Sequence, residues 1–201
     1  MAVLVLLALV FAIVATRESN SRRSSSTPSA GEVPLTSGGF AGAEVPNPQP
    51  APPIILSDQY GRSVSLAALR GKPVVIAFLY THCGAPCTLI AQQIRGALDE
   101  LHEPVPVLIV SADPAGDTPQ AVRRFLAATS LSGRVHYLTG SPAALAKIWR
   151  TYRVTPAGAG ARAFATHATV LLVDPDGRER VLYGTEQLTP EALAHDIGRF
   201  M

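Results

Sequence analysis

Two cysteines, Cys83 and Cys87, are the only thiols in the 201-residue chain, and three residues separate them. They follow the apolar run 74–80 and precede residues that recur at helical spacing, so they lie where a strand becomes a helix. In open sheets with helices on both faces, ligands and reactive groups gather beyond the carboxyl ends of the strands. This position favours a chemical role for the pair over that of two buried structural thiols.

The spacing of the two cysteines leaves two chemistries open. Helical residues four apart have β-carbons ~5–6 Å from each other, whereas a relaxed disulfide needs ~3.5–4.5 Å, so a bridge would distort the turn somewhat. Two thiolates on one metal ion stand about 4 Å apart, so the pair suits a bridging ion at least as well. Because Cys83 precedes the helix proper, the loop can adjust and both states stay accessible.

The predicted helix begins without a capping side chain. Pro86 is typical of the first helical position, but Ala85 before it has no side-chain oxygen to accept from the free amides. The open amides and the positive end of the helix dipole then favour thiolate, the species that binds soft metals or attacks disulfides. We expect this stabilisation of the thiolate to be largest for Cys87, which lies inside the first turn.

The spacing of apolar residues predicts the strands and the helix around the cysteines. Residues 74–80 are typical of a central strand buried on both faces. A helix is predicted over 86–102 and the next strand over 105–111. Ahead of them, residues 54–66 read as a hairpin that turns at Gly61, in the left-handed position.

Three later helices are predicted from a hydroxyl residue that precedes a proline, which is a helix-start signature. The three pairs are Thr118-Pro119, Ser141-Pro142 and Thr189-Pro190. Strands fill the gaps at 135–138, 168–174 and 180–183, with 174–177 as a hairpin turn. A β-α-β half followed by a β-β-α half predicts an α/β, thioredoxin-like fold. Its central mixed sheet of four or five strands is flanked by helices and carries an N-terminal β-hairpin extension.

Composition excludes several kinds of function. The chain has 17 basic and 15 acidic side chains, and charged residues make up 16% of it. This weak charge gives no field suited to nucleic acid or to a polybasic membrane surface. Two cysteines cannot build a disulfide framework or a four-thiolate zinc site, which leaves a single bridge, a redox pair or a small metal site.

The N-terminal residues 1–16 are predicted to be a membrane anchor or signal segment, because residues 1–15 are all apolar. Fifteen helical residues reach roughly 22 Å, short of the ~30 Å hydrocarbon core. A cleaved signal would carry basic residues before this run, so an uncleaved anchor is favoured. Arginines after the run would hold the rest of the chain in the cytoplasm, an orientation that a start upstream of Met1 would change. These arginines are Arg17, Arg22 and Arg23.

Residues 17–53 are predicted to be a disordered tether. Residues 16–53 contain seven Ser, seven Pro and four Gly and show no apolar periodicity. Within this tether, the stretch 38–53 can run along the domain as extended chain, with Phe40 and Val45 as apolar contacts. The folded domain is predicted over 54–201.

A third metal ligand would come from the five histidines. A solvated helix face or strand alternation explains His102, His195 and His136. His82 is adjacent to Cys83, so its side chain is expected to point away from the thiol. His167 differs because it opens the strand 168–174, whose start should face the same sheet edge as the cysteines. On its own, a histidine at a strand start is more typical of a surface or turn residue.

Several motifs together resemble the Sco/SenC copper-chaperone family. They are VVIAFLYTHCGAPC over 74–87, SADP through DTP over 111–119, and His167 ahead of VLLVDPDG. The likeness spans about residues 38–200 and includes DQYGRSVSL, RGKP and LTG. It implies a thioredoxin-like domain held outside the cytoplasm by one membrane anchor. It also implies that Cys83, Cys87 and His167 bind one copper ion, and two sulfurs with an imidazole suit Cu(I).

The same resemblance assigns lesser roles and shows two departures. Asp113 and Asp117 belong to the family motif and are interpreted as loop-ordering residues, with Asp113 a candidate for a place just behind the metal ligands. Gly84 and Thr88 stand where the family usually has prolines, which predicts a more mobile loop.

Two functions from different classes follow. The resemblance implies a monomeric, non-enzymatic metallochaperone on the extracytoplasmic face, which exchanges copper with other carriers and delivers it to the dinuclear copper centre of a respiratory cytochrome c oxidase. The alternative is an extracytoplasmic thiol-disulfide oxidoreductase in which Cys83 and Cys87 reduce the target cysteines. Oxidoreductases of the thioredoxin type usually carry C-x-x-C and a proline at the facing strand start. Here C-x-x-x-C and Thr166-His167 stand instead, which favours the chaperone.

Overall fold

A run of buried apolar residues forms the central strand of the structure, a computed structural model that describes residues 33–157 and 170–201. Strand β4 (Val74–Leu79) is buried along its whole length, as predicted. It pairs in parallel with β5 (Val107–Ser111) and antiparallel with β7 (Val170–Val173). The sheet is therefore mixed at its centre. Because β4 and β5 are parallel, their carboxyl ends lie at the same edge of the sheet.

Three further strands complete the sheet on either side. Strand β6 (His136–Leu138) pairs in parallel with β5, and β8 (Glu179–Tyr183) pairs antiparallel with β7. The short β1 (Ala43–Glu44) adds to β8. In the part of the chain that the structure describes, the order is β1-β8-β7-β4-β5-β6. The mixed sheet was predicted with four or five strands and has six, because the segment expected to be a tether contributes β1.

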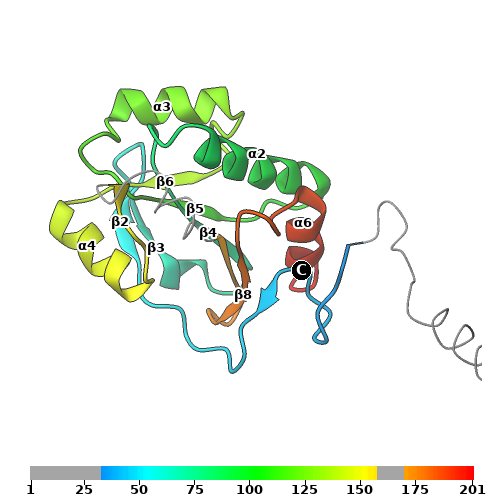
Figure 1. Cartoon of the computed structure of the whole chain (residues 1–201). Coiled ribbons are helices and arrows are strands. Elements are labelled where there is room, and N and C mark those ends of the chain that lie inside the picture. Colours follow the sequence, from blue (N-terminus) through cyan, green and yellow to red (C-terminus); the bar gives the residue numbers. More distant parts are fainter. Residues whose placement is uncertain (1–32, 158–169) are drawn as a thin grey trace, which may run out of the picture. The chain divides into compact units, whose positions relative to one another are not determined.

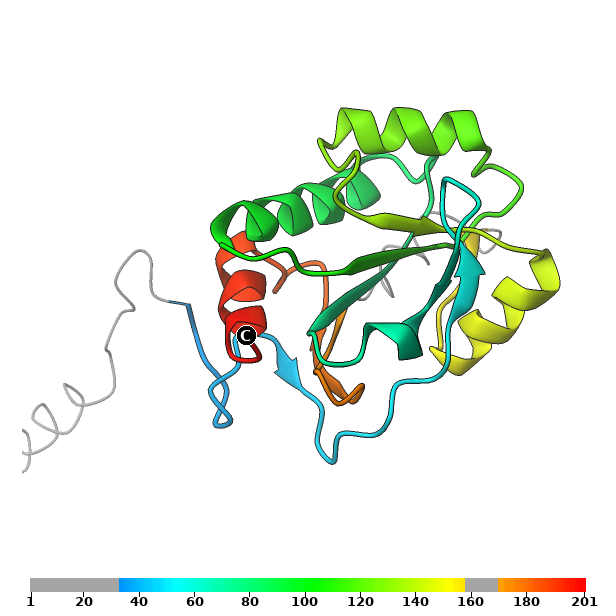
Figure 2. The same cartoon turned by 180° about the vertical axis from the view of Figure 1, so that it is seen from behind.

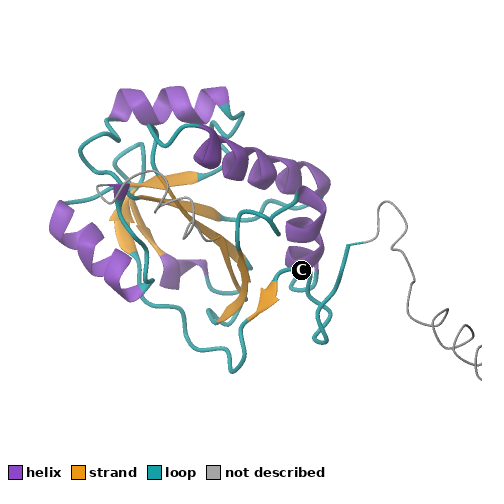
Figure 3. Cartoon of the chain, in the orientation of Figure 1, coloured by secondary structure: helices purple, strands orange, loops and turns teal. Residues whose placement is uncertain are grey.

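Helices cover both faces of the sheet (Figures 1, 2 and 3). Helix α4 (Pro142–Thr151) packs on the face that presents alternate residues of β4, among them Ile76 and Phe78. On the other face, α3 (Pro119–Ala128) brings Phe125 against Tyr137 of β6. Helix α2 (Ala85–Glu100) packs there against α6 (Pro190–Gly198). This two-sided burial explains why β4 reads as an unbroken apolar run.

The three helix starts predicted from hydroxyl-proline pairs are confirmed. The side chains of Thr118, Ser141 and Thr189 accept hydrogen bonds from backbone amides three residues ahead, at 3.2, 3.2 and 3.1 Å respectively. Each cap satisfies one amide that the first helical turn leaves without an intrahelical partner. The β5–α3 connection therefore leads into a helix with a well-defined start.

The predicted hairpin is present and covers the outer edge of β6. Strands β2 (Ile55–Ser57) and β3 (Ser63–Ser65) are joined by a turn in which Gly61 has a φ of +78°, and the 3-10 helix η1 (Leu66–Leu69) follows. The Gln59 side chain donates to Val135 O at 2.9 Å and accepts from Tyr137 N at 2.8 Å. An amide side chain thereby continues the pairing of a strand edge that would otherwise be open.

The segment predicted to be a disordered tether is in part structured. The compact unit begins at Leu35 rather than at Ile54. Residues 35–53, here called the N-terminal strap, include β1, and Phe40 is buried and stacked on Phe200. The buried carboxylate of Asp196 accepts from the amides of Ala41 and Gly42. A carboxylate supplied by α6, far along the chain, holds a segment whose own composition cannot order it.

The anchor or signal segment predicted over 1–16 lies outside the described residues, as does 17–32. Among the helices that the structure describes, none combines the length and the hydropathy that a membrane crossing requires.

Candidate metal centre

Cys83 and Cys87 lie together at the edge of the sheet where β4 ends, and they are joined by a disulfide. Their Cα atoms are 5.7 Å apart, inside the usual range of about 4.4–6.8 Å for bridged cysteines. Cys83 lies before α2, as predicted, so the loop is free of the helical spacing and can bring the two sulfurs together. Both residues are buried, Cys87 almost completely.

The helix that carries Cys87 begins at an uncapped end, as predicted, but one residue earlier. Gly84 is the residue before α2 and makes no side-chain cap, so Ala85 and Pro86 occupy the first turn. Gly84 has a φ of +77°, a left-handed conformation that proline cannot adopt and other residues rarely do. The glycine between the cysteines therefore permits a loop path that a proline at this position would forbid.

The loop between β4 and α2 exposes His82 while it buries Cys83, which agrees with the expected alternation. The Nδ1 atom of His82 lies 3.0 Å from the Thr81 hydroxyl. The turn closes where Cys83 N donates to Tyr80 O at 3.3 Å. A buried disulfide thus sits beside a solvent-facing imidazole.

Asp113 and Asp117 lie on the neighbouring β5–α3 loop. Asp113 accepts from Gly116 N at 3.1 Å, so it orders its own loop. A β-carbon added to Gly116 would lie 2.3 Å from Asp113 Oδ2 and 3.2 Å from His82 Nδ1, so both side chains border this glycine. Asp113 and His82, the residue before Cys83, thus lie near the same glycine. Asp117 is buried and accepts from Thr81 N at 2.7 Å, a bond that joins the two loops.

Sequence reasoning missed two residues of this cluster. Tyr137 and Ser111 both donate to Asp117 Oδ2, at 2.7 and 2.6 Å. Both lie within buried strands, and there packing and strand propensity already explain the residue type of Tyr137. Ser111 opens the motif SADP, but its hydrogen bond to Asp117, like that of Tyr137, is formed only in the folded chain.

His167, the predicted third ligand, lies outside the described residues. The register of the described part of β7 gives the direction of that strand. Val170, three residues later, pairs with Ala77, near the carboxyl end of β4, and β7 then runs back toward Val74. The start of β7 therefore faces the sheet edge that holds the cysteines, as the sequence predicted.

Other histidines have structural partners or are remote in sequence from the loop. His136 Nδ1 lies 3.3 Å from Asp58, and His195 Nδ1 lies 2.8 Å from Asp196. His102 is exposed beyond the end of α2. Within residues 33–157 and 170–201, no three side chains among His, Cys, Asp and Glu gather closely enough to hold an ion.

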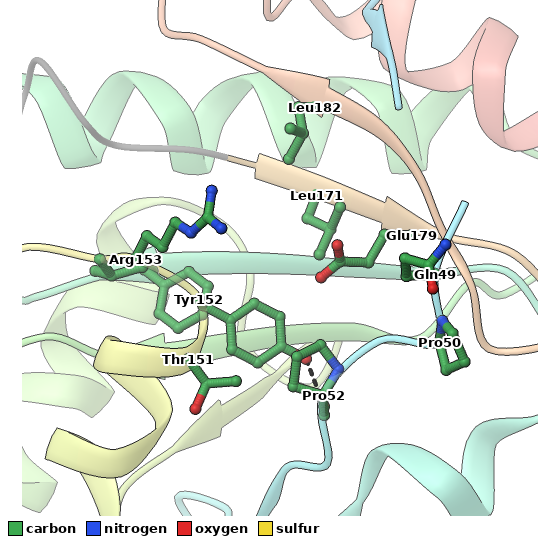
Figure 4. Close-up of a pocket in the computed structure, with 11 residues that line it drawn as sticks. Gln49, Pro50, Pro52, Thr151, Tyr152, Arg153, Leu171, Glu179 and Leu182 are labelled. Atoms are coloured by element: carbon green, nitrogen blue, oxygen red, sulfur yellow. Dashed lines mark hydrogen bonds between the residues drawn. The ribbon is translucent and has the colours of Figure 1, made fainter. Parts of the chain in front are cut away.

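A separate hollow of about 320 Å³ lies between the end of α4, the strap and the β7–β8 pair (Figure 4). Its walls include Phe78, Tyr152 and Leu171, and Tyr152 donates to Pro52 O at 2.6 Å. Burial raises the pKa of the Glu179 carboxyl on its rim, and Arg153 opposes this rise. None of its lining residues belongs to the cysteine loop, so it is distinct from the candidate metal centre.

One family of proteins matches most of the folded unit. The family model described as SCO1/SenC matches residues 46–201. Protein SenC of Rhodobacter capsulatus is 29% identical over 157 residues, which cover 74% of this chain and 69% of that protein.

Solved structures share the fold. ScoI of Bradyrhizobium japonicum, solved with copper bound, is 31% identical with a TM-score of 0.58, and the match covers 76% of this chain and 100% of that one. BsSco, 24% identical with a TM-score of 0.62, is matched over 76% of this chain and 94% of its own. It is described as a member of the Sco family of cytochrome c oxidase assembly proteins with a disulfide switch. The predicted thioredoxin-like fold is confirmed.

Proposed function

Because this chain belongs to the SCO1/SenC family, we propose that it is a monomeric copper metallochaperone that carries one ion on Cys83, Cys87 and His167. We further propose that it exchanges copper with other carriers and delivers it to the dinuclear copper centre of a respiratory cytochrome c oxidase. The observation that carries the proposal is the pair of buried sulfurs brought together at the end of β4. A relative that is 31% identical was solved with copper bound.

The donor set fits copper as a cargo. Two thiolates and one imidazole are soft and borderline ligands, and such a set suits Cu(I). The uncapped start of α2 places free amides and the positive end of the helix dipole next to Cys87, which favours its thiolate form. A site of so few ligands can release its ion to a partner by exchanging one ligand at a time.

The test is anaerobic copper loading of residues 35–201, the compact unit, after reduction of the disulfide. We expect one Cu(I) per chain to survive competition with a chelator. The oxidised form of the same protein is the matched control, because its sulfurs are occupied with each other, and it should retain no copper. Equal retention by both forms would contradict the proposal.

The disulfide itself favours a second candidate function, thiol-disulfide exchange with a target protein. In that reaction the thiols of Cys83 and Cys87 become a disulfide, and the target disulfide gains the two electrons and two protons. The substrate for its test is a disulfide peptide that has the sequence of an oxidase copper-site loop. If the reduced protein reduces this peptide much faster than dithiothreitol does, and retains no copper, this second function is the better account.

We also propose that the folded unit lies on the extracytoplasmic face, held by the apolar segment 1–16. A disulfide persists more readily in such oxidising surroundings, which supports this location. A reporter enzyme active only outside the cytoplasm, fused after Phe200, should be active when expressed from the longest reading frame. A silent reporter from a stably expressed fusion would place the cysteines in the cytoplasm.

A further inference from the structure

We propose that Asp117 is a positioning residue of the copper site. Its carboxylate holds the backbone of the loop that carries Cys83, so that the two cysteine sulfurs stay close together in the reduced protein. The link to copper rests on the proposed function, whereas the link to the cysteine pair stands on the geometry of the loop alone.

The two oxygens of Asp117 divide between the loop and the sheet. Oδ1 accepts from the backbone amide of Thr81 at 2.7 Å. Oδ2 accepts from the hydroxyls of Ser111 and Tyr137, at 2.6 and 2.7 Å. One oxygen of the carboxylate therefore binds the cysteine loop, while the other binds side chains from two neighbouring strands, β5 and β6.

Thr81 lies where the loop leaves the regular pairing of the sheet. The parallel ladder reaches Leu79, whose carbonyl accepts from Ala112 N at 2.9 Å. Cys83 follows two residues after Thr81. It lies in the turn that is closed by the hydrogen bond from its own backbone amide to Tyr80 O. A bond at Thr81 thus fixes the backbone just before the first sulfur, while α2 fixes the second.

Ser111 and Tyr137 are themselves held by further contacts. Tyr137 packs edge-on against Phe125, and Trp149 Nε1 donates to Ser111 O at 2.9 Å. Burial raises the pKa of the Tyr137 phenol well above its ordinary value, and the charge of Asp117 raises it further, so the hydroxyl stays protonated and donates. Removing the carboxylate would leave buried donors unpaired as well as release the loop.

The chain offers a matched control in Asp196. This second buried carboxylate also accepts from backbone amides, those of Ala41 and Gly42, and from a tyrosine hydroxyl, that of Tyr183. It holds the N-terminal strap rather than the cysteine loop. Loss of either carboxylate should destabilise the fold, but only the loss of Asp117 should change how the two sulfurs meet.

The experiment measures disulfide formation in the full chain, in detergent, against glutathione. The two thiols of Cys83 and Cys87 lose two electrons and two protons to one oxidised glutathione, which becomes two reduced glutathione molecules. In Asp117→Ala we expect the equilibrium constant for this oxidation, and the Cu(I) affinity, to fall on the order of tenfold, as for the loss of one charge-assisted hydrogen bond. Asp196→Ala should keep both values within about twofold of the wild type.

A conservative variant separates positioning from packing. In Asp117→Asn the side-chain carbonyl can still accept from Thr81 N, and its amide can donate to the hydroxyl oxygens of Ser111 and Tyr137. We expect this variant to recover most of the loss. If Asp117→Ala does not fold, Tyr137→Phe replaces it, and a fall of about threefold in the oxidation constant is expected from the loosened carboxylate.

The proposal would be overturned if Asp117→Ala had the wild-type oxidation constant and Cu(I) affinity. If Asp117→Ala does not fold, a wild-type oxidation constant in Tyr137→Phe would overturn it. So would an equal fall in Asp196→Ala, because the effect would then reflect general destabilisation. If the wild type binds no copper, the proposed function fails, but the glutathione equilibrium still decides whether Asp117 positions the cysteines.

Discussion

Replacing either Cys83 or Cys87 by alanine is expected to lower the Cu(I) affinity of the reduced protein by about a thousandfold. A structural metal site with four ligands is worth ~10–16 kcal/mol, so one of its bonds accounts for roughly 2.5–4 kcal/mol, and the upper end of this range corresponds to about a thousandfold in affinity. The remaining thiolate and one imidazole cannot make up this loss, because the two sulfurs are the soft ligands of the set. Competition with a Cu(I) chelator under anaerobic conditions measures the change.

The control for the cysteine variants is Leu89→Ala, on the same turn of α2 as Cys87. The Leu89 side chain is 46% exposed, so its loss should leave both the fold and the copper affinity unchanged. An affinity within about tenfold of the wild type in either cysteine variant would show that copper binds elsewhere. The double variant tests whether the sulfurs act as one unit, since it should then bind hardly more weakly than either single variant.

The fold could be predicted where the sequence encodes local structure. Thr118, Ser141 and Thr189 mark helix starts because cap and proline lie within one turn of each other, and the structure bears out all three. Strand β4 could be predicted because burial on both faces demands an unbroken apolar run. Such signals need no knowledge of the rest of the chain.

The N-terminal strap shows where local reasoning stops. Most of its residues are Pro, Gly, Ala or polar, its larger apolar side chains are few and show no periodicity, and β1 is only the pair Ala43 and Glu44. What orders the strap is remote in sequence: the Asp196 carboxylate, the ring of Phe200 and the edge of β8. A segment that lacks its own core can be ordered by a surface that the rest of the fold supplies.

The candidate site divides in the same way. Cys83 and Cys87 could be found from residue type, spacing and position after β4, and the direction of β7 from the order of the elements. The hydrogen bond between Asp117 and Thr81 could not be predicted. The Asp117 carboxylate is held in place by Ser111 and Tyr137, which lie on two different strands. The sequence marks the reactive atoms, whereas tertiary contacts set how firmly they are held.

The second large effect is expected at His167. Replacing it by alanine should lower the Cu(II) affinity on the order of a hundredfold, because Cu(II) requires more ligands and favours nitrogen. The Cu(I) affinity should fall by less than about tenfold, since two thiolates can hold Cu(I) in linear geometry. Parallel titrations of each oxidation state, with the copper spectrum followed for Cu(II), measure the two losses.

Two histidine controls identify which imidazole binds. His82→Ala removes the exposed ring next to Cys83, and His102→Ala removes an exposed ring beyond the end of α2. Both variants should keep the wild-type preference between Cu(I) and Cu(II). If His82→Ala shows the selective loss of Cu(II) instead, the nitrogen ligand is the neighbour of the cysteine. Equal losses of both oxidation states in His167→Ala would mean that this residue supports the loop rather than the metal, because a ligand that distinguishes the two ions must affect them unequally.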